Sequence, residues 1–305
     1  METGVAIIPS VLTLEECEQM RSGMWNYLES VSADFETPIS RDKPNTWKEF
    51  KKLYPSHSML LQWWGVGHSQ FVWDLRQNPK IVRIFADLWE TESDKMLVSF
   101  DGAAFHLPPE ITNFGWYHPR TQWLHTDQSY LRNNFECIQG WVTANTIDTG
   151  DATLQYLEGS HLLHAEFRKR FSPTDKADCY KLTSEQIEWY TKEMGCSLKE
   201  IVCPAGSLVL WDSRTIHSGK QPSKERVHPN TRCVVYICML PRIHADEKEL
   251  KKKRKAFEEM RMTSHWPNRI KLFPKKPRTY GGKYAEVKSL PPPNLTPLGK
   301  KLAGF

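Results

Sequence analysis

The sequence lacks the cysteine pattern of a zinc knuckle or of a disulfide-stapled domain. Its 305 residues include seven cysteines, an odd number, and no two of them form a Cys-x-x-Cys pair. Zinc knuckles need closely spaced cysteine pairs, and disulfide frameworks usually have an even number of cysteines in a small secreted domain. We therefore expect free thiols in a reducing compartment, and we look for a metal site among histidines and carboxylates.

Long apolar runs and targeting segments are also missing. No stretch approaches the roughly 18 apolar residues of a membrane-spanning helix. Met1 to Ser10 has no basic segment followed by the apolar run of a secretory signal, and we find no internal repeats. The composition, 39% hydrophobic and 25% charged, is typical of a globular protein. We expect a cytoplasmic protein without a membrane span.

Positive charge is in modest excess and is concentrated near the end of the chain. The net charge is +5, and residues 248–255 and 271–278 are rich in lysine and arginine. A solvated helix face followed by a basic surface arm explains these runs. An anionic partner is the alternative, as is a nuclear import signal for the run 251–255.

A His-x-Asp pair is the first sign of chemistry. In an extended strand, alternate side chains share a face, so His125 and Asp127 point the same way. His217 is the best candidate for a third ligand. Two histidines and one carboxylate leave three positions of an octahedral metal open, as in non-haem Fe(II) oxygenases. The pair alone also fits a half-exposed polar strand, so the surrounding sequence must decide.

Short runs of β-forming residues alternate with turn signals along much of the chain. The runs that we expect to form strands, besides the His-x-Asp segment, are 5–9, 96–105, 137–147, 152–157, 201–203, 207–211 and 232–240. Strands of this length, with helices only at the periphery, predict a mainly β protein built as an antiparallel double sheet or jelly roll.

The helical segments predict how the chain is divided. Thr13-Leu14-Glu15-Glu16 resembles a capping box that opens an amphipathic helix, and residues 71–89 are helical with a break at Asn78-Pro79. Residues 32–72 are irregular and rich in aromatic residues, as in a surface excursion or an active-site lid. We expect a single domain over 1–245, with its core at about 70–242 and a charged helical insertion at about 162–200. A basic helix and arm follow over 246–305.

Several motifs in register resemble one enzyme family. They are His125-Thr126-Asp127, Gly140-Trp141-Val142-Thr143-Ala144, Gly159-Ser160-His161, and the segment from Pro204 through Asp212 to His217, followed by an arginine-headed strand. In order and spacing they are similar to the phytanoyl-CoA 2-hydroxylase (phytanoyl-CoA dioxygenase) family of Fe(II)- and 2-oxoglutarate-dependent oxygenases. The resemblance covers roughly residues 70–242. It implies a double-stranded β-helix, the cupin-like jelly roll, with Fe(II), 2-oxoglutarate and O2 as cofactor and co-substrates.

The resemblance also assigns roles to residues. His125, Asp127 and His217 would ligate iron, and Arg232 would bind the distal carboxylate of 2-oxoglutarate, because a planar guanidinium matches a carboxylate. Arg226 is the rival, since it lies closer to His217 in the sequence. We prefer Arg232 because it begins the strand 232–240, so that its side chain can face the barrel.

Four further residues are secondary candidates. Trp141 resembles a tryptophan that walls the co-substrate pocket, although a simple core position explains it equally well. Ser218 and Gln122 are candidate hydrogen-bond donors to 2-oxoglutarate. Asp212 either orients a metal ligand or turns the chain.

The activity that the resemblance implies is hydroxylation of a small organic substrate with release of succinate and CO2. Related halogenases replace the iron-binding carboxylate with a small residue, whereas this chain keeps Asp127. The alternatives are the same chemistry on a nucleic acid held by the basic tail, a metal-binding scaffold without turnover, and a zinc hydrolase.

Acyl-CoA thioesters, amino-acid derivatives and natural products are all substrates in the family, and the basic charge balance suits an anionic one. The sequence indicates no oligomeric state.

Overall fold

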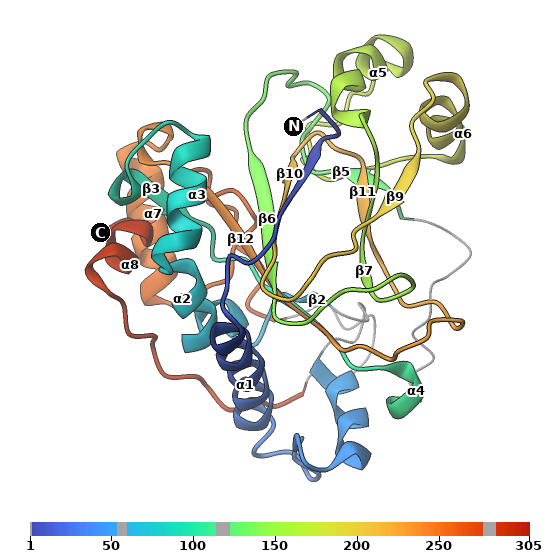
Figure 1. The fold of residues 1–305 in the computed structure, drawn as a ribbon. Coiled ribbons are helices and arrows are strands. Elements are labelled where there is room, and N and C mark those ends of the chain that lie inside the picture. The colour runs from blue at the N-terminus through green and yellow to red at the C-terminus, as the bar shows by residue number, and fades with distance from the viewer. Residues whose placement is uncertain (1, 54–59, 114–122, 277–284) are drawn as a thin grey trace.

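Two antiparallel β-sheets face each other in the computed structural model, which describes residues 2–53, 60–113, 123–276 and 285–305 (Figure 1). Side chains from both sheets meet between them in one apolar cluster that includes Trp141, Val234 and Leu154. The predicted jelly roll is therefore confirmed. Helices nevertheless hold more of the chain than strands do, about 35% against 19%.

The larger sheet has seven strands and carries the main core on its outer face. Its order is β1 (Val5–Ile8), β10 (Leu208–Asp212), β6 (Ile138–Thr143), β12 (Arg232–Pro241), β4 (Ala103–His106) and β2 (Leu60–Leu61), while β3 (Met96–Val98) pairs with the far end of β12. Along β6, β10 and β12, alternate residues face the helices and the second sheet. Both faces are therefore apolar.

The smaller sheet has five short strands. Its order is β8 (Tyr180–Lys181), β5 (His125–Thr126), β11 (His217–Lys220), β7 (Thr153–Leu157) and β9 (Leu198–Glu200). The predicted insertion 162–200 is thus only partly helical, because it supplies β8 and β9, the two edges of this sheet. Its helices pack over Leu157 and Ile216 on the outer face.

Most helices gather on the outer side of the seven-stranded sheet (Figure 1). The α-helices are α1 (Leu14–Val31), α2 (Gln70–Arg76), α3 (Pro79–Leu88), α4 (Pro109–Thr112), α5 (His164–Phe171), α6 (Ser184–Glu188), α7 (Glu247–Glu258) and α8 (Pro297–Leu302). Five 3-10 segments, η1 (Pro44–Leu53), η2 (Val66–His68), η3 (Ser93–Lys95), η4 (Ser160–Leu163) and η6 (Arg242–His244), and one π-helical turn, η5 (Trp189–Glu193), complete the described elements. The capping box predicted at Thr13 is present, and the break at Asn78-Pro79 separates α2 from α3.

The expected strand 96–105 is divided, because the chain leaves the sheet between β3 and β4. Gly102 lies in this gap and approaches the main chain of β2 closely: a Cβ atom there would meet the Leu61 carbonyl oxygen at 1.9 Å. The alternation of the sequence could not show this break, since it depends on the strand β2, whose Leu61 lies 41 residues earlier in the chain (102 − 61).

Residues 32–72 contribute to the core. The described part contains η1, β2 and η2, and Phe50, Leu53 and Val66 are buried among the residues of α1 and α2. These three side chains therefore pack against the helices.

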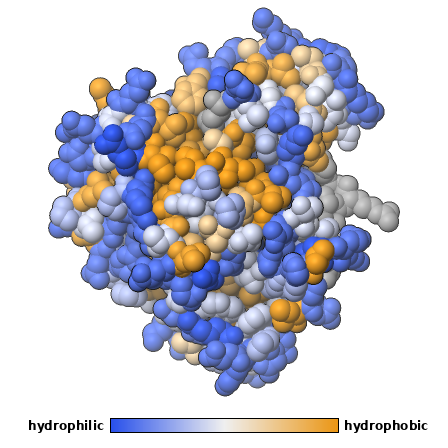
Figure 2. Space-filling view, viewed as in Figure 1, coloured by the Kyte–Doolittle hydropathy of each residue, from blue (hydrophilic) through white to orange (hydrophobic). Residues whose placement is uncertain are grey.

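The C-terminal residues pack on the same core. Leu250, Lys253 and Ala256 form the buried face of α7, and α8 buries Leu302. In the described residues, no helix is long and apolar enough to cross a membrane. Figure 2 shows an apolar area on the viewed face, over the edge strand β1, where Ile7 is 40% exposed.

Candidate metal centre and active site

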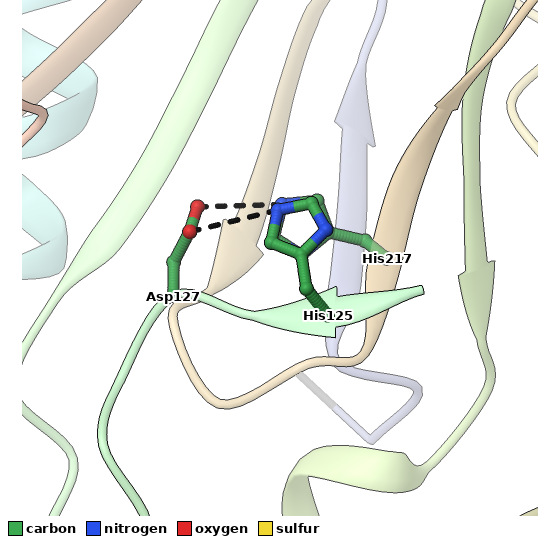
Figure 3. Close-up of side chains that lie close together, drawn as sticks. All are labelled: His125, Asp127 and His217. Atoms are coloured by element: carbon green, nitrogen blue, oxygen red, sulfur yellow. Dashed lines mark ion pairs between the residues drawn. The ribbon is translucent and has the colours of Figure 1, made fainter. Parts of the chain in front are cut away.

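Two neighbouring strands of the smaller sheet bring three predicted ligands together. His125 in β5 pairs directly with His217, the first residue of β11. The strand ends at Thr126, so Asp127 lies one residue beyond it rather than within it, yet its carboxylate turns toward both imidazoles (Figure 3). Its oxygens lie 3.6 Å from His125 Nε2 and 3.4 Å from His217 Nε2. One ligand atom of each residue lies within 4.8 Å of the others.

Main-chain carbonyls fix the orientation of both histidines. His125 Nδ1 contacts the Trp123 carbonyl oxygen at 3.2 Å, and His217 Nδ1 contacts that of Thr215 at 2.9 Å. Because a carbonyl only accepts, the proton of each neutral ring lies on Nδ1. In the neutral form of each ring, Nε2 therefore lies on the side of Asp127 with its lone pair available to a metal ion.

Burial and charge set the protonation of the three side chains. Burial, with a smaller repulsion from His217, lowers the pKa of His125 to about 4. Burial alone would raise the pKa of Asp127, but the two imidazoles that face its carboxylate, His217 first and then His125, hold that pKa well below its usual range. A neutral imidazole beside an ionised carboxylate is the state that binds a divalent cation.

A second layer of hydrogen bonds holds Asp127. Gln139 Nε2 donates to Asp127 Oδ2 at 3.1 Å, and the Asp127 amide donates to the Ser213 carbonyl at 3.1 Å. Asp212 accepts hydrogen bonds from Arg214 and turns the chain there. Its carbonyl also accepts from Thr215, whose own carbonyl orients His217. Asp212 therefore acts through the turn and does not touch a ligand.

This donor set fits a non-haem Fe(II). Two imidazole nitrogens and one carboxylate converge from one side, which leaves the other positions for exogenous ligands. Thiolates would favour zinc, and an all-oxygen set would favour magnesium or calcium; neither is found here.

Arg232 lies in the space between the sheets. Its guanidinium lies over the Trp141 ring, 5.3 Å from the ring centroid, and donates to the Ala152 carbonyl at 3.2 Å. The residue is 3% exposed, and its Nε has no hydrogen-bond partner among the described residues. No ion pair between Arg232 and a carboxylate is found among the described residues. A buried guanidinium of this kind fits the carboxylate of 2-oxoglutarate.

The rival arginine already has its carboxylates. Arg226 contacts Glu110 at 2.7 Å and Asp151 at 2.9 Å, and its side chain is 1% exposed. Two acidic partners neutralise this cation, so Arg226 is a structural ion-pair residue. The geometry favours Arg232 as the 2-oxoglutarate anchor.

Of the secondary candidates, Trp141 lies beside Arg232, whereas Ser218 faces away from the space between the sheets. Trp141 is buried beneath Arg232, and its Nε1 has no partner among the described residues. Ser218 follows His217, so its side chain lies on the opposite face of β11, where its Oγ accepts a hydrogen bond from Gln155 at 2.8 Å. It is therefore not among the side chains that face the space between the sheets. Gln122 lies outside the described residues.

Sequence reasoning missed several residues near this centre. Gln139 lies two positions before Trp141 on the same face of β6, so strand alternation could have found it. Tyr236 lies four positions after Arg232, contacts its guanidinium and could have been found in the same way. Asp101 and His265 interact electrostatically with Asp127, and no local sequence signal identifies them.

A jelly roll that holds two histidines, an aspartate and a buried arginine without an acidic partner in the described ranges has the architecture of a non-haem Fe(II)- and 2-oxoglutarate-dependent oxygenase. Within this class, the chain belongs to the phytanoyl-CoA dioxygenase (PhyH) family, whose model matches residues 1–226. The family uses Fe(II), 2-oxoglutarate and O2, so this protein is an enzyme of that class.

One curated relative and two solved structures illustrate the similarity. The Ava biosynthesis cluster protein O of Aspergillus versicolor is 30% identical over 244 residues, which are 77% of this chain and 75% of that protein. The hypothetical protein JW0805 from Escherichia coli has a TM-score of 0.57 at 14% identity and covers 100% of this chain and 80% of its own. The non-haem α-ketoglutarate-dependent carbocyclase SnoK from nogalamycin biosynthesis has a TM-score of 0.49 at 16% identity, covering 79% and 80%. The structure from Escherichia coli supports the fold alone.

Proposed function

We propose that the protein hydroxylates a small organic molecule and that His125, Asp127 and His217 hold the iron that this reaction needs. The observation that carries the proposal is the position of two complementary groups: a three-ligand cluster with two buried histidines, and a buried Arg232 that has no carboxylate partner among the described residues. When bound, Fe(II) with 2-oxoglutarate supplies O2 activation coupled to release of succinate and CO2.

The residues of the chain prepare and shield the site. Main-chain carbonyls orient His125 and His217, while Gln139 fixes the Asp127 carboxylate. Arg232 orients the co-substrate through its distal carboxylate, and Trp141 supports the guanidinium from below. The apolar cluster between the sheets excludes water from this region.

A small molecule is favoured over a nucleic acid as the substrate. The relative from Aspergillus versicolor is named for a biosynthesis cluster, which supports a metabolite of such a pathway. Two residues of the basic run make contacts within the protein and are not free to bind a nucleic acid: Lys253 is buried, and Arg254 pairs with Glu247 at 2.5 Å. We also propose a cytoplasmic location, which the seven free cysteines support.

The test is O2-dependent succinate formation with a panel of small metabolites. We expect turnover in the wild type, none in His217→Ala, and a strongly raised requirement for 2-oxoglutarate in Arg232→Lys, because an ammonium cannot bind a carboxylate through two parallel hydrogen bonds. Arg83→Ala is the matched control, since Arg83 pairs only with Asp87 on the exposed face of α3. Full turnover in His217→Ala would refute the proposed iron site.

A further inference from the structure

A C-terminal hairpin outside the region matched by the family model reaches the candidate active site. Residues 261–273 fold back on themselves through a bridge between Thr263 and Leu272. Thr263 exchanges hydrogen bonds with Phe100, amide to carbonyl and amide to hydroxyl, both at 3.0 Å. The carbonyl of Arg261 accepts from His68 at 2.9 Å. The hairpin is therefore fixed to the connection between β3 and β4.

Two contacts place the middle of the hairpin close to residues that neighbour the metal-ligand cluster. Thr263 binds the residue that precedes Asp101. On the other side, Trp266 is buried against Cys137 and Cys238, and Cys238 pairs in register with Gln139, the donor to Asp127. His265 lies between these two anchors and interacts electrostatically with the carboxylates of Asp101 and Asp127 and with His125.

The imidazole of His265 has an unused hydrogen-bonding atom. Its Nε2 is buried and has no hydrogen-bond partner among the residues that the structure describes. The ring packs against Trp266, with 5.1 Å between the two ring centroids. A buried polar atom without a partner costs free energy unless a ligand or water completes it. Near a reaction centre, such an atom is a natural contact for a polar group of a substrate.

An exposed aromatic side chain lies next to one of the proposed metal ligands. The centroid of the Trp123 ring is 4.1 Å from that of the His125 ring, and Trp123 is 49% exposed. A half-exposed indole offers a flat apolar face. The surroundings of the metal ligands thus combine one flat apolar contact with one unpaired imidazole nitrogen.

We propose that His265 is a substrate-binding residue that hydrogen-bonds a hydroxyl group of a flat, mainly apolar substrate whose ring packs against Trp123. The inference rests on the proposed function and names the substrate class of that same site. It also assigns a role to the C-terminal region, which supplies a wall of the active site.

A cycle of protein and ligand variants tests the hydrogen bond. The probes are 4-methylphenol and toluene, which have the same flat shape and differ by one hydroxyl. Broadening of their methyl proton signals reports binding to the full-length protein loaded with Mn(II) and 2-oxoglutarate. The protein variants are His265→Ala, the conservative His265→Gln, and His228→Ala as a control at an exposed histidine.

We expect the wild type and His228→Ala to bind 4-methylphenol about 3- to 10-fold more tightly than toluene, as one hydrogen bond allows. The ratio should fall toward one in His265→Ala and recover in part in His265→Gln. An unchanged ratio in His265→Ala, or no binding of either probe to the wild type, overturns the proposal. Binding of Mn(II) and 2-oxoglutarate is measured first by calorimetry, so a failure of the proposed function itself is seen separately.

Discussion

Gln139 holds the carboxylate of Asp127, the proposed metal ligand, in position. Its amide donates to Asp127 Oδ2 and so fixes one of the three ligands. Residues that orient metal ligands typically contribute about 10- to 100-fold to metal affinity. We therefore expect Gln139→Ala to weaken Fe(II) binding by about that factor while the arginine anchor stays intact, as measured by anaerobic metal competition.

Gln155 provides the control for that experiment. It is also a buried glutamine on a central strand, but its amide donates to Ser218 on the other face of the smaller sheet. Gln155→Ala should lower stability and leave Fe(II) affinity unchanged. Equal loss of affinity in both variants would contradict a specific role for Gln139.

Arg226 and Arg232 should respond differently to truncation. Arg226→Ala leaves Asp151 and Glu110 without their cation. We expect a loss of about 3–5 kcal/mol in the free energy of unfolding, as for other broken buried ion pairs, with 2-oxoglutarate affinity retained by the folded fraction. Denaturant unfolding and calorimetry measure the two quantities. A stable Arg226→Ala variant that no longer binds 2-oxoglutarate would exchange the roles of the two arginines.

The candidate site was predictable where its chemistry is local in sequence. His125 and Asp127 share a short motif, and His217 follows a recognisable strand. The choice between Arg226 and Arg232 needed the structure, because Glu110 and Asp151 lie far from Arg226 along the chain. Ser218 was a candidate by proximity to His217, yet strand alternation turns it to the opposite face.

At the scale of elements, His68 joins η2 to the C-terminal hairpin and makes this junction sensitive to pH. Burial lowers the pKa of His68 from 6.5 to about 3. Between these values the unfolded chain binds a proton that the folded chain does not, so stability rises with pH across this window. Above pH 6.5 the contribution of His68 is constant.

We therefore expect acidification from pH 6.5 toward pH 3 to destabilise the protein, in part through His68. The pH dependence of the unfolding free energy should be shallower in His68→Gln than in the wild type. His244→Ala is the control, because His244 is exposed. Parallel curves for the wild type and His68→Gln would show that His68 does not titrate in this way.

Local sequence signals predicted the helices better than the strand limits. The capping box at Thr13 and the Asn78-Pro79 break act within one helical turn, and both are present. The strand 96–105 was predicted as one element, because its apolar pattern does not show that Gly102 lies against β2. Strands β8 and β9 were hidden for the same reason: each has only two or three residues and forms through pairing with distant strands.

At the scale of the whole molecule, the C-terminal arm holds the helical layer together. Leu302 and Ala303 are fully buried, and α8 lies against β3 and η3. Deletion of residues 291–305 should lower Tm by about 5–10 °C, because it removes a buried leucine and its neighbours from the core. Thermal unfolding measures the change, and an unchanged Tm would show that the arm does not stabilise the core.

The role of the C-terminal region was the least predictable part of the molecule. Its lysines suggested a solvated surface, but Lys253 is buried, donates to the Val98 carbonyl and lies 4.1 Å from the Phe100 ring centroid. Such a contact depends on residues about 150 positions earlier in the chain. Charge pattern alone therefore misrepresents which of these lysines face solvent.

The central claim is that one site binds Fe(II) and 2-oxoglutarate together. The most direct measurement is the visible absorption spectrum of the anaerobic protein on addition of Fe(II) and then 2-oxoglutarate. A charge-transfer band should appear in the wild type only when both are present, require a higher 2-oxoglutarate concentration in Arg232→Lys, and be absent in His125→Ala. A folded, iron-loaded wild type without this band, or a band of equal strength in His125→Ala, would contradict the account.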